Sequence, residues 1–180
     1  MQNVPKALKS MTVLSFSLSL LASLLFVRFR LEPCLTLAIT FGTLFYHLAI
    51  RLCVGLLFQA RMQNRADYRK KWYQLRPWEA KLYALLHVKA WKGKMPTYNA
   101  AAFSPKEHSW DEIAQAMCQA ELVHEANMLL SFLPVLASRW FGAFYVFLAT
   151  SLCGAAFDLA FVIMQRYNRA RILKIAGKRP

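Results

Sequence analysis

A glutamate and a histidine stand one helical turn apart in the segment AELVHE, residues 120–125. On a helix, Glu121, His124 and Glu125 occupy adjoining parts of one face, where a carboxylate can orient and polarise an imidazole. Histidine has an ordinary pKa near 6.5, so a modest local field makes it a general base at neutral pH. The pattern therefore predicts that His124 accepts a proton from a hydroxyl group and that Glu121 fixes its tautomer.

Two other interpretations of this spacing remain open. Glu-x-x-His is also the ligand spacing of di-iron bundle proteins, which supply two such pairs and two more carboxylates. This chain has one pair, to which His47 and Asp158 would have to add ligands, so we expect no metal. A buried ion-pair network that only locks helices together is the other alternative.

Further ionisable residues lie inside apolar stretches. His47 and Arg51 share one stretch, and Asp158 lies in another. A charge at the centre of a membrane helix costs about 2.5–3.5 kcal/mol on insertion scales, so such groups usually face the bundle interior and pair with one another. The composition agrees, with 57% apolar residues, 18% charged residues and a mean hydropathy of +0.29. We therefore expect a membrane protein with an internal polar site. In a reaction at this site, Arg51 would stabilise the negative charge that develops on a substrate oxygen.

Four apolar segments are long enough to cross a bilayer, at about residues 11–27, 35–58, 117–136 and 142–164. They predict an all-α integral membrane bundle that forms one domain over residues 1–180. A loop over residues 59–115 and a tail over residues 165–180 complete it. Of the 23 Lys and Arg residues, 19 precede the first span or lie in this loop and tail. The positive-inside rule then predicts a multi-pass protein of the cell membrane with both termini and the loop in the cytoplasm.

The long loop is basic and aromatic, and one part of it has helical periodicity. Residues 78–91 follow Pro77, which suits a first helical turn. One face of this segment carries Trp78, Leu82, Leu85, Leu86 and Val88. We expect an amphipathic helix on the cytoplasmic surface. The net charge of +14 follows the membrane topology, no nucleic-acid-binding motif accompanies it, and the lipid bilayer is the expected partner.

Several motifs resemble a known family. They are AELVH at residues 120–124, Leu133 with Pro134, QRYNRAR at residues 165–171 and KAWKGK at residues 89–94. Together they resemble the glycosyl-4,4'-diaponeurosporenoate acyltransferases, small membrane enzymes of staphyloxanthin-type carotenoid synthesis. The resemblance implies transfer of a fatty acyl group to a hydroxyl of a glycosylated isoprenoid or other glycolipid at the membrane.

Carried over by motif, Glu121 and His124 match the family's carboxylate and histidine. The tail residues that match are Arg166, Asn168, Arg169 and Arg171. Ala170 and Glu125 depart from the family pattern and leave the acceptor lipid open. We assign substrate binding to these tail residues and to His47, Glu125, Asp158, Lys92 and Lys94.

The basic loop, through Lys92 and Lys94, is expected to hold an acyl-CoA or an acyl carrier protein, with no other cofactor. We also expect at least one of Arg166 and Arg169 to turn back toward the polar cluster. Its Lys variant should be inserted but impaired, because Lys cannot reproduce the planar donor of Arg. The sequence lacks the His-x-x-x-x-Asp signature and the Gly-x-Ser-x-Gly elbow, which favours direct attack by the acceptor. The alternative function is a non-catalytic membrane scaffold or lipid-binding subunit that docks a soluble enzyme through the loop.

Overall fold

The computed structural model describes residues 4–177, and this part of the chain is helical, without strands. The long helices are α1 (Val4–Phe29), α2 (Glu32–Met62), α5 (Trp110–Leu130) and α7 (Phe144–Ile175), and the shorter ones are α3 (Pro77–Leu85), α4 (Val88–Trp91) and α6 (Leu133–Phe141). Single 3-10 turns lie at Lys71–Tyr73 (η1), Lys92–Lys94 (η2) and Ala101–Phe103 (η3). The predicted all-α class is confirmed.

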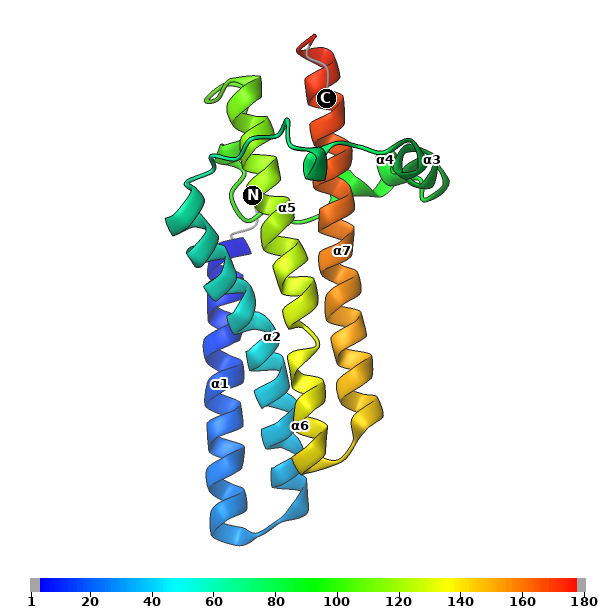
Figure 1. Ribbon diagram of the computed structural model, residues 1–180. Coiled ribbons are helices and arrows are strands. Elements are labelled where there is room, and N and C mark those ends of the chain that lie inside the picture. Colours follow the sequence, from blue (N-terminus) through cyan, green and yellow to red (C-terminus); the bar gives the residue numbers. More distant parts are fainter. Residues whose placement is uncertain (1–3, 178–180) are drawn as a thin grey trace.

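The long helices run side by side, with α5 packed between α2 and α7 and α1 packed against α2 (Figure 1). Helices α1, α2 and α7 are long and apolar enough to cross a membrane, and they contain the predicted spans 11–27, 35–58 and nearly all of 142–164. Helix α7 continues past its apolar part to Ile175, so the QRYNRAR segment is helical. It carries its arginines beyond the span.

The expected third span, residues 117–136, is not one continuous helix. Helix α5 ends at Leu130 and α6 begins at Leu133, because Pro134 has no N–H to offer the Leu130 carbonyl four residues earlier. The hydroxyl of Tyr46 on α2 donates to that carbonyl at 2.8 Å instead. Within the described residues, α5 is not among the helices apolar enough to span alone. The structure thus gives three candidate spans instead of four.

The loop that joins α2 to α5 packs on the end of the bundle where α2 ends and α5 begins. Helix α5 starts at a capping box in which Glu112 accepts from the Ser109 backbone N–H at 2.8 Å. Below it, a buried apolar cluster joins Tyr68 and Tyr73 of this segment to Cys118 on α5 and Leu173 on α7. This packing fixes the segment that follows α2 against the two helices that carry the polar residues.

The expected amphipathic helix over residues 78–91 is interrupted. Helix α3 ends at Leu85, and His87 has a left-handed backbone with φ of 49° before the short α4 begins. The exposed apolar face is present: Trp78, Leu82, Leu85 and Leu86 are solvent-exposed. Val88 is instead fully buried, because the break rotates it into the protein. The two helices project sideways from α7 (Figure 1).

Candidate functional site

A histidine, an aspartate and an arginine from three helices meet inside the bundle. The two oxygens of Asp158 on α7 are divided between Nδ1 of His124 on α5, at 2.9 Å, and Nη2 of Arg51 on α2, at 2.5 Å. The Asp158 side chain is fully buried. A buried carboxylate needs such partners, and the three residues therefore form one polar unit, the inner cluster, at the centre of an apolar bundle.

The ring of His124 is held in a fixed plane. It stacks on Phe161 of α7 with ring centroids 4.4 Å apart and an interplanar angle of 10°. With Nδ1 directed at a carboxylate, Nε2 is the nitrogen that can accept a proton. The side chain is 22% exposed, so this nitrogen is not sealed inside the protein. His124 is thus oriented by Asp158 and Phe161, and its Nε2 is left for another partner.

Arg51 fills the space between α2 and α7. Its Nη1 donates to the carbonyl of His47 at 2.5 Å, and its Nη2 donates to the carbonyl of Gly154 at 3.1 Å as well as to Asp158. A guanidinium has five N–H groups, so these bonds leave donors for a further oxygen. His47, one turn away on α2, lies beside it, but its ring nitrogens make no hydrogen bond in the described structure.

A second group of charges, the outer cluster, lies nearer the C-terminal end of α7. Fully buried Glu121 on α5 pairs with Nη1 of Arg166 at 2.8 Å and also with Arg169. Arg166 reaches Glu79 of α3 at 3.0 Å. The expectation that Arg166 or Arg169 turns back toward the polar residues is confirmed for both. Glu121, however, bonds to these arginines and not to His124; Asp158 takes the orienting position that the sequence assigned to Glu121.

The outer cluster also fixes the segment that precedes α3. Arg166 donates to the carbonyls of Trp72 and Gln74 at 3.1 and 3.2 Å, and Arg169 donates to the carbonyl of Tyr73 at 2.5 Å. Glu125 accepts from the indole N–H of Trp72 at 3.1 Å. Each contact joins a helix of the bundle to the loop. These residues hold the loop against the bundle.

Burial in this region also alters two tyrosines. Burial, with Cys118 and Glu121 nearby, raises the pKa of Tyr73 to about 12. Burial and Glu79 raise the pKa of Tyr83 to about 12. Both phenols therefore stay neutral at physiological pH and add no further negative charge beside the glutamates.

A third group is cationic and faces the surface. Lys92 donates through Nζ to Oδ1 of Asn168, and both Lys92 and Arg171 lie over the ring of Tyr167, at 5.2 and 5.9 Å. Burial and the neighbouring Arg171 lower the pKa of Lys92. Lys94 is exposed two residues away. Of the predicted loop and tail residues, Lys92, Asn168 and Arg171 therefore come together, outside the inner cluster.

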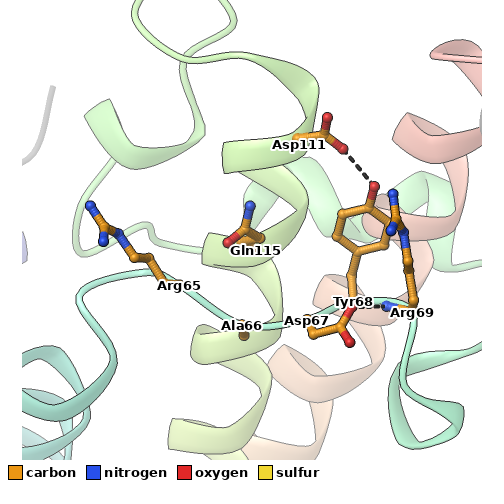
Figure 2. A pocket seen from close by; sticks show the side chains of 7 residues that line it. All are labelled: Arg65, Ala66, Asp67, Tyr68, Arg69, Asp111 and Gln115. Atoms are coloured by element: carbon orange, nitrogen blue, oxygen red, sulfur yellow. Dashed lines mark hydrogen bonds between the residues drawn. The ribbon is translucent and has the colours of Figure 1, made fainter.

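A surface hollow of about 500 Å³ lies where the chain leaves α2 and passes α5. Figure 2 shows Tyr68 directed at Asp111, with its hydroxyl donating to that carboxylate at 2.6 Å, and Arg65 lying apart from the pair. The residues lining the hollow include none of those predicted for the site. Among residues 4–177, no group of three or more His, Cys, Asp or Glu side chains is placed to hold a metal ion.

Two participants were missed by sequence reasoning. Glu79 is 6% exposed and pairs with Arg166, although it belongs to a helix expected to lie on the surface. The available signal was its place as the only acidic residue between Asp67 and Glu107. Gly154 was also missed, and nothing in its sequence context marks it as the point where α7 approaches His47 and Arg51.

The comparisons with known proteins agree with the motifs. The family model described as glycosyl-4,4'-diaponeurosporenoate acyltransferase matches residues 69–178, a region that contains His124, Asp158 and the whole outer cluster. No curated protein and no solved structure matches the chain. Because the match covers more than half of the sequence, this chain belongs to the glycosyl-4,4'-diaponeurosporenoate acyltransferase family.

Proposed function

We propose that this protein is a membrane acyltransferase that moves a fatty acyl group from a thioester donor to a hydroxyl of a glycosylated isoprenoid or another glycolipid. The observation that carries the proposal is the inner cluster, in which Asp158 orients His124 and also pairs with Arg51. Family membership supports the reaction class, since the family is named for acyl transfer to a glycosylated carotenoid acid.

The chemistry follows from the hydrogen bonds. Nε2 of His124 takes the proton of the acceptor hydroxyl while the oxygen of that hydroxyl attacks the thioester carbonyl carbon of the donor. Asp158 stabilises the imidazolium, and a free N–H of Arg51 stabilises the oxyanion of the tetrahedral intermediate. Collapse of this intermediate breaks the thioester C–S bond and leaves the new ester, and Nε2 of His124 returns the proton to the leaving thiolate. A positioned general base of this kind contributes about 10²–10⁴-fold in rate.

The donor is proposed to approach from the cytoplasm. Lys92, Lys94 and Arg171 supply positive charge at the loop and tail, which suits the phosphates of acyl-CoA or the acidic face of an acyl carrier protein. Because a thioester donor is already activated, the reaction needs no further cofactor.

For the membrane arrangement, we propose that α5 and α6 together make the crossing between α2 and α7. The protein then crosses the cell membrane four times with both termini cytoplasmic, as the distribution of Lys and Arg favours. Helix α3 would lie on the cytoplasmic surface through its exposed Trp78, Leu82 and Leu85.

The test uses purified protein in nanodiscs, glycolipid acceptors and labelled acyl-CoA or acyl carrier protein, with the ester detected by mass spectrometry. We expect an ester with the wild type and a loss of about 10²-fold or more with His124→Gln. His108→Gln is the matched control, because His108 is 39% exposed and lies away from the inner cluster. Undiminished transfer by His124→Gln would rule out His124 as the base.

A scaffold or lipid-binding subunit is the second candidate, favoured by the exposed Trp72, Trp78 and Leu85 on the loop. Such a protein would need these side chains but not the imidazole. In a deletion strain, His124→Gln should then restore the parental lipid profile, whereas an enzyme carrying this change should not.

A further inference from the structure

Buried polar atoms without hydrogen-bond partners lie in the membrane part of the structure. They are both ring nitrogens of His47, Oδ1 of Asn127 and Oγ of Ser151. Asn127 is 2% exposed and Ser151 is fully buried. Hydrocarbon offers no hydrogen bonds, so a polar group left unpaired there is strongly unfavourable. An arrangement of several such atoms indicates that something else binds them.

One of these groups, His47, packs against a glycine, and the helical positions of Asn127 and Ser151 direct them toward the same place. A Cβ added to Gly154 on α7 would meet Oγ of Ser131 at 3.2 Å and Nδ1 of His47 at 3.3 Å, so no larger residue fits without displacing them. Ser151 lies one turn before Gly154 on α7, and Asn127 on α5 lies one turn before Ser131, the C-cap residue of that helix. We call His47, Asn127, Ser131 and Ser151, arranged around Gly154, the hydroxyl cradle.

The hydroxyl cradle adjoins the inner cluster. Nη2 of Arg51 lies 3.4 Å from the position of a Gly154 Cβ, and it bonds to both Gly154 and Asp158. On α5, Asn127 follows His124 by one turn. A ligand in the cradle is therefore about one helical turn, roughly 5 Å, from the reacting groups.

The unpaired atoms define the chemistry of this ligand. Oδ1 of Asn127 can only accept a hydrogen bond, whereas Ser151 and His47 can donate and accept. A carbonyl or a fully ionised phosphate offers acceptors alone and would leave Oδ1 of Asn127 unpaired. A group of hydroxyls both donates and accepts, which fits a polyhydroxy head group.

An apolar groove begins beside the cradle. Its cavity of about 400 Å³ is lined by α1, α2, α6 and α7 and has Tyr46, Leu133 and Phe147 among its lining residues. Tyr46 precedes His47, and Phe147 lies one turn before Ser151. Ligand pockets commonly measure about 300–1,000 Å³, and this one at the lower end suits a single hydrocarbon tail. Polar and apolar subsites thus follow one another along the bundle.

We infer that groove and hydroxyl cradle together bind the acceptor lipid, with its tail in the groove and its neighbouring hydroxyls in the cradle. This rests on the proposed acyl transfer and deepens it. Asn127 and Ser151 are then positioning residues, because they determine which hydroxyl reaches His124. The donor enters from the opposite, cytoplasmic side, so the two substrates meet at the inner cluster.

The test compares two acceptors with the same tail, dodecyl glucoside and dodecanol, with one saturated acyl-CoA. Ser151→Ala should lower kcat/KM for the glucoside about tenfold, mostly through KM, and should spread the ester over several sugar positions. The value for dodecanol should stay within about twofold, because that acceptor has no neighbouring hydroxyl. Asn127→Leu should show the same pattern.

Thr150→Val is the matched control on α7. The Thr150 hydroxyl already bonds to the carbonyls of Val146 and Phe147 on its own helix, and its side chain is exposed. The kcat/KM of this variant should therefore equal that of the wild type with both acceptors. If Ser151→Ala lowered kcat/KM equally with both acceptors, or lowered it with neither, the cradle assignment would be overturned. Absence of ester from wild-type protein with either acceptor would instead overturn the proposed acyl transfer, on which the assignment rests.

A second variant tests the groove. Ala137 on α6 lines it, whereas the neighbouring Leu136 is 64% exposed and does not. Ala137→Phe should reduce the use of dodecyl glucoside several-fold more than that of hexyl glucoside, because the shorter tail still fits. Leu136→Phe should leave the ratio unchanged. An unchanged ratio in Ala137→Phe would place the tail elsewhere.

Discussion

Asp158 uses one oxygen for a histidine and the other for an arginine, and this division sets the character of the inner cluster. The carboxylate orients His124 while Arg51 compensates its charge. A single aspartate can serve both because α2 and α5 lie on either side of it. Glu121, in contrast, faces two arginines and has the surroundings of a structural ion pair.

Replacing Asp158 by Asn should therefore affect catalysis more than replacing Glu121 by Gln. An amide cannot stabilise the imidazolium, and we expect kcat per folded molecule to fall by about 10²-fold or more. Glu121→Gln leaves the buried Arg169 without its carboxylate partner and should cost about 3–5 kcal/mol of stability instead. Rates and thermal unfolding in nanodiscs separate the two effects. The opposite ranking would restore Glu121 as the residue that orients His124.

Arg169→Lys should be inserted into the membrane but less stable. Arg169 is 2% exposed and donates to both Glu121 and the Tyr73 carbonyl, which a single ammonium cannot reproduce in the same geometry. A buried carbonyl left unpaired costs about 1–3 kcal/mol. The loop around Tyr73 should then be cleaved faster by protease. Arg171→Lys, at an exposed position, is the control. If protease cleaved the loop equally slowly in both variants, Arg169 would not be the residue that holds the loop against the bundle.

At the scale of elements, the break between α5 and α6 brings α2 into the site. Pro134 leaves the Leu130 carbonyl without a helical N–H donor, and the hydroxyl of Tyr46 on α2 donates to this carbonyl instead. This contact fixes α2 beside the end of α5, next to Ser131 and His47. The irregular backbone in an apolar region is tolerable because a neighbouring helix satisfies it.

Tyr46→Phe should loosen this junction. The change removes the hydroxyl that donates to the Leu130 carbonyl, so we expect a loss of about 1–3 kcal/mol of stability. Pro134→Ala in the same background should recover part of it, because Ala supplies the missing helical N–H. Thermal unfolding of the two variants and the double variant measures the coupling. Independent, additive effects would show that the Tyr46 contact does not compensate for Pro134.

For the whole molecule, the loop and the C-terminal end of α7 lie at one end of the bundle, and the α1–α2 turn lies at the other (Figure 1). The cationic residues around Lys92 and Arg171 share the loop end. A donor held there and a lipid acceptor held inside the bundle would approach the inner cluster from opposite directions.

Cysteine labelling tests the proposed orientation. Cys34 lies near the start of α2, at the α1–α2 end, and is partly exposed, while Tyr98 is exposed in the loop. With the other cysteines replaced, Cys34 should react with an impermeant maleimide in intact cells. A Tyr98→Cys variant lacking Cys34 should react only after permeabilisation. The reverse pattern would place the loop outside the cell.

The sequence by itself determined the class of the protein and the residues that could do chemistry. Apolar length, the placement of Lys and Arg, and ionisable groups within apolar segments are local properties of the chain, so they predict helices, spans and polar positions. His124, Asp158 and Arg51 were all identified in this way, and family membership followed from the motifs at residues 120–124 and 165–171.

The tertiary structure alone decided which of these residues are partners. Helical spacing placed Glu121 beside His124, but the register of α5 against α7 sets Asp158 opposite His124 and the two arginines opposite Glu121. The packing of α2 against α7 brings His47 to Gly154, and the packed bundle leaves Oδ1 of Asn127 and Oγ of Ser151 unpaired. Contacts between helices depend on how side chains pack across the whole interface, which spacing within one helix does not specify.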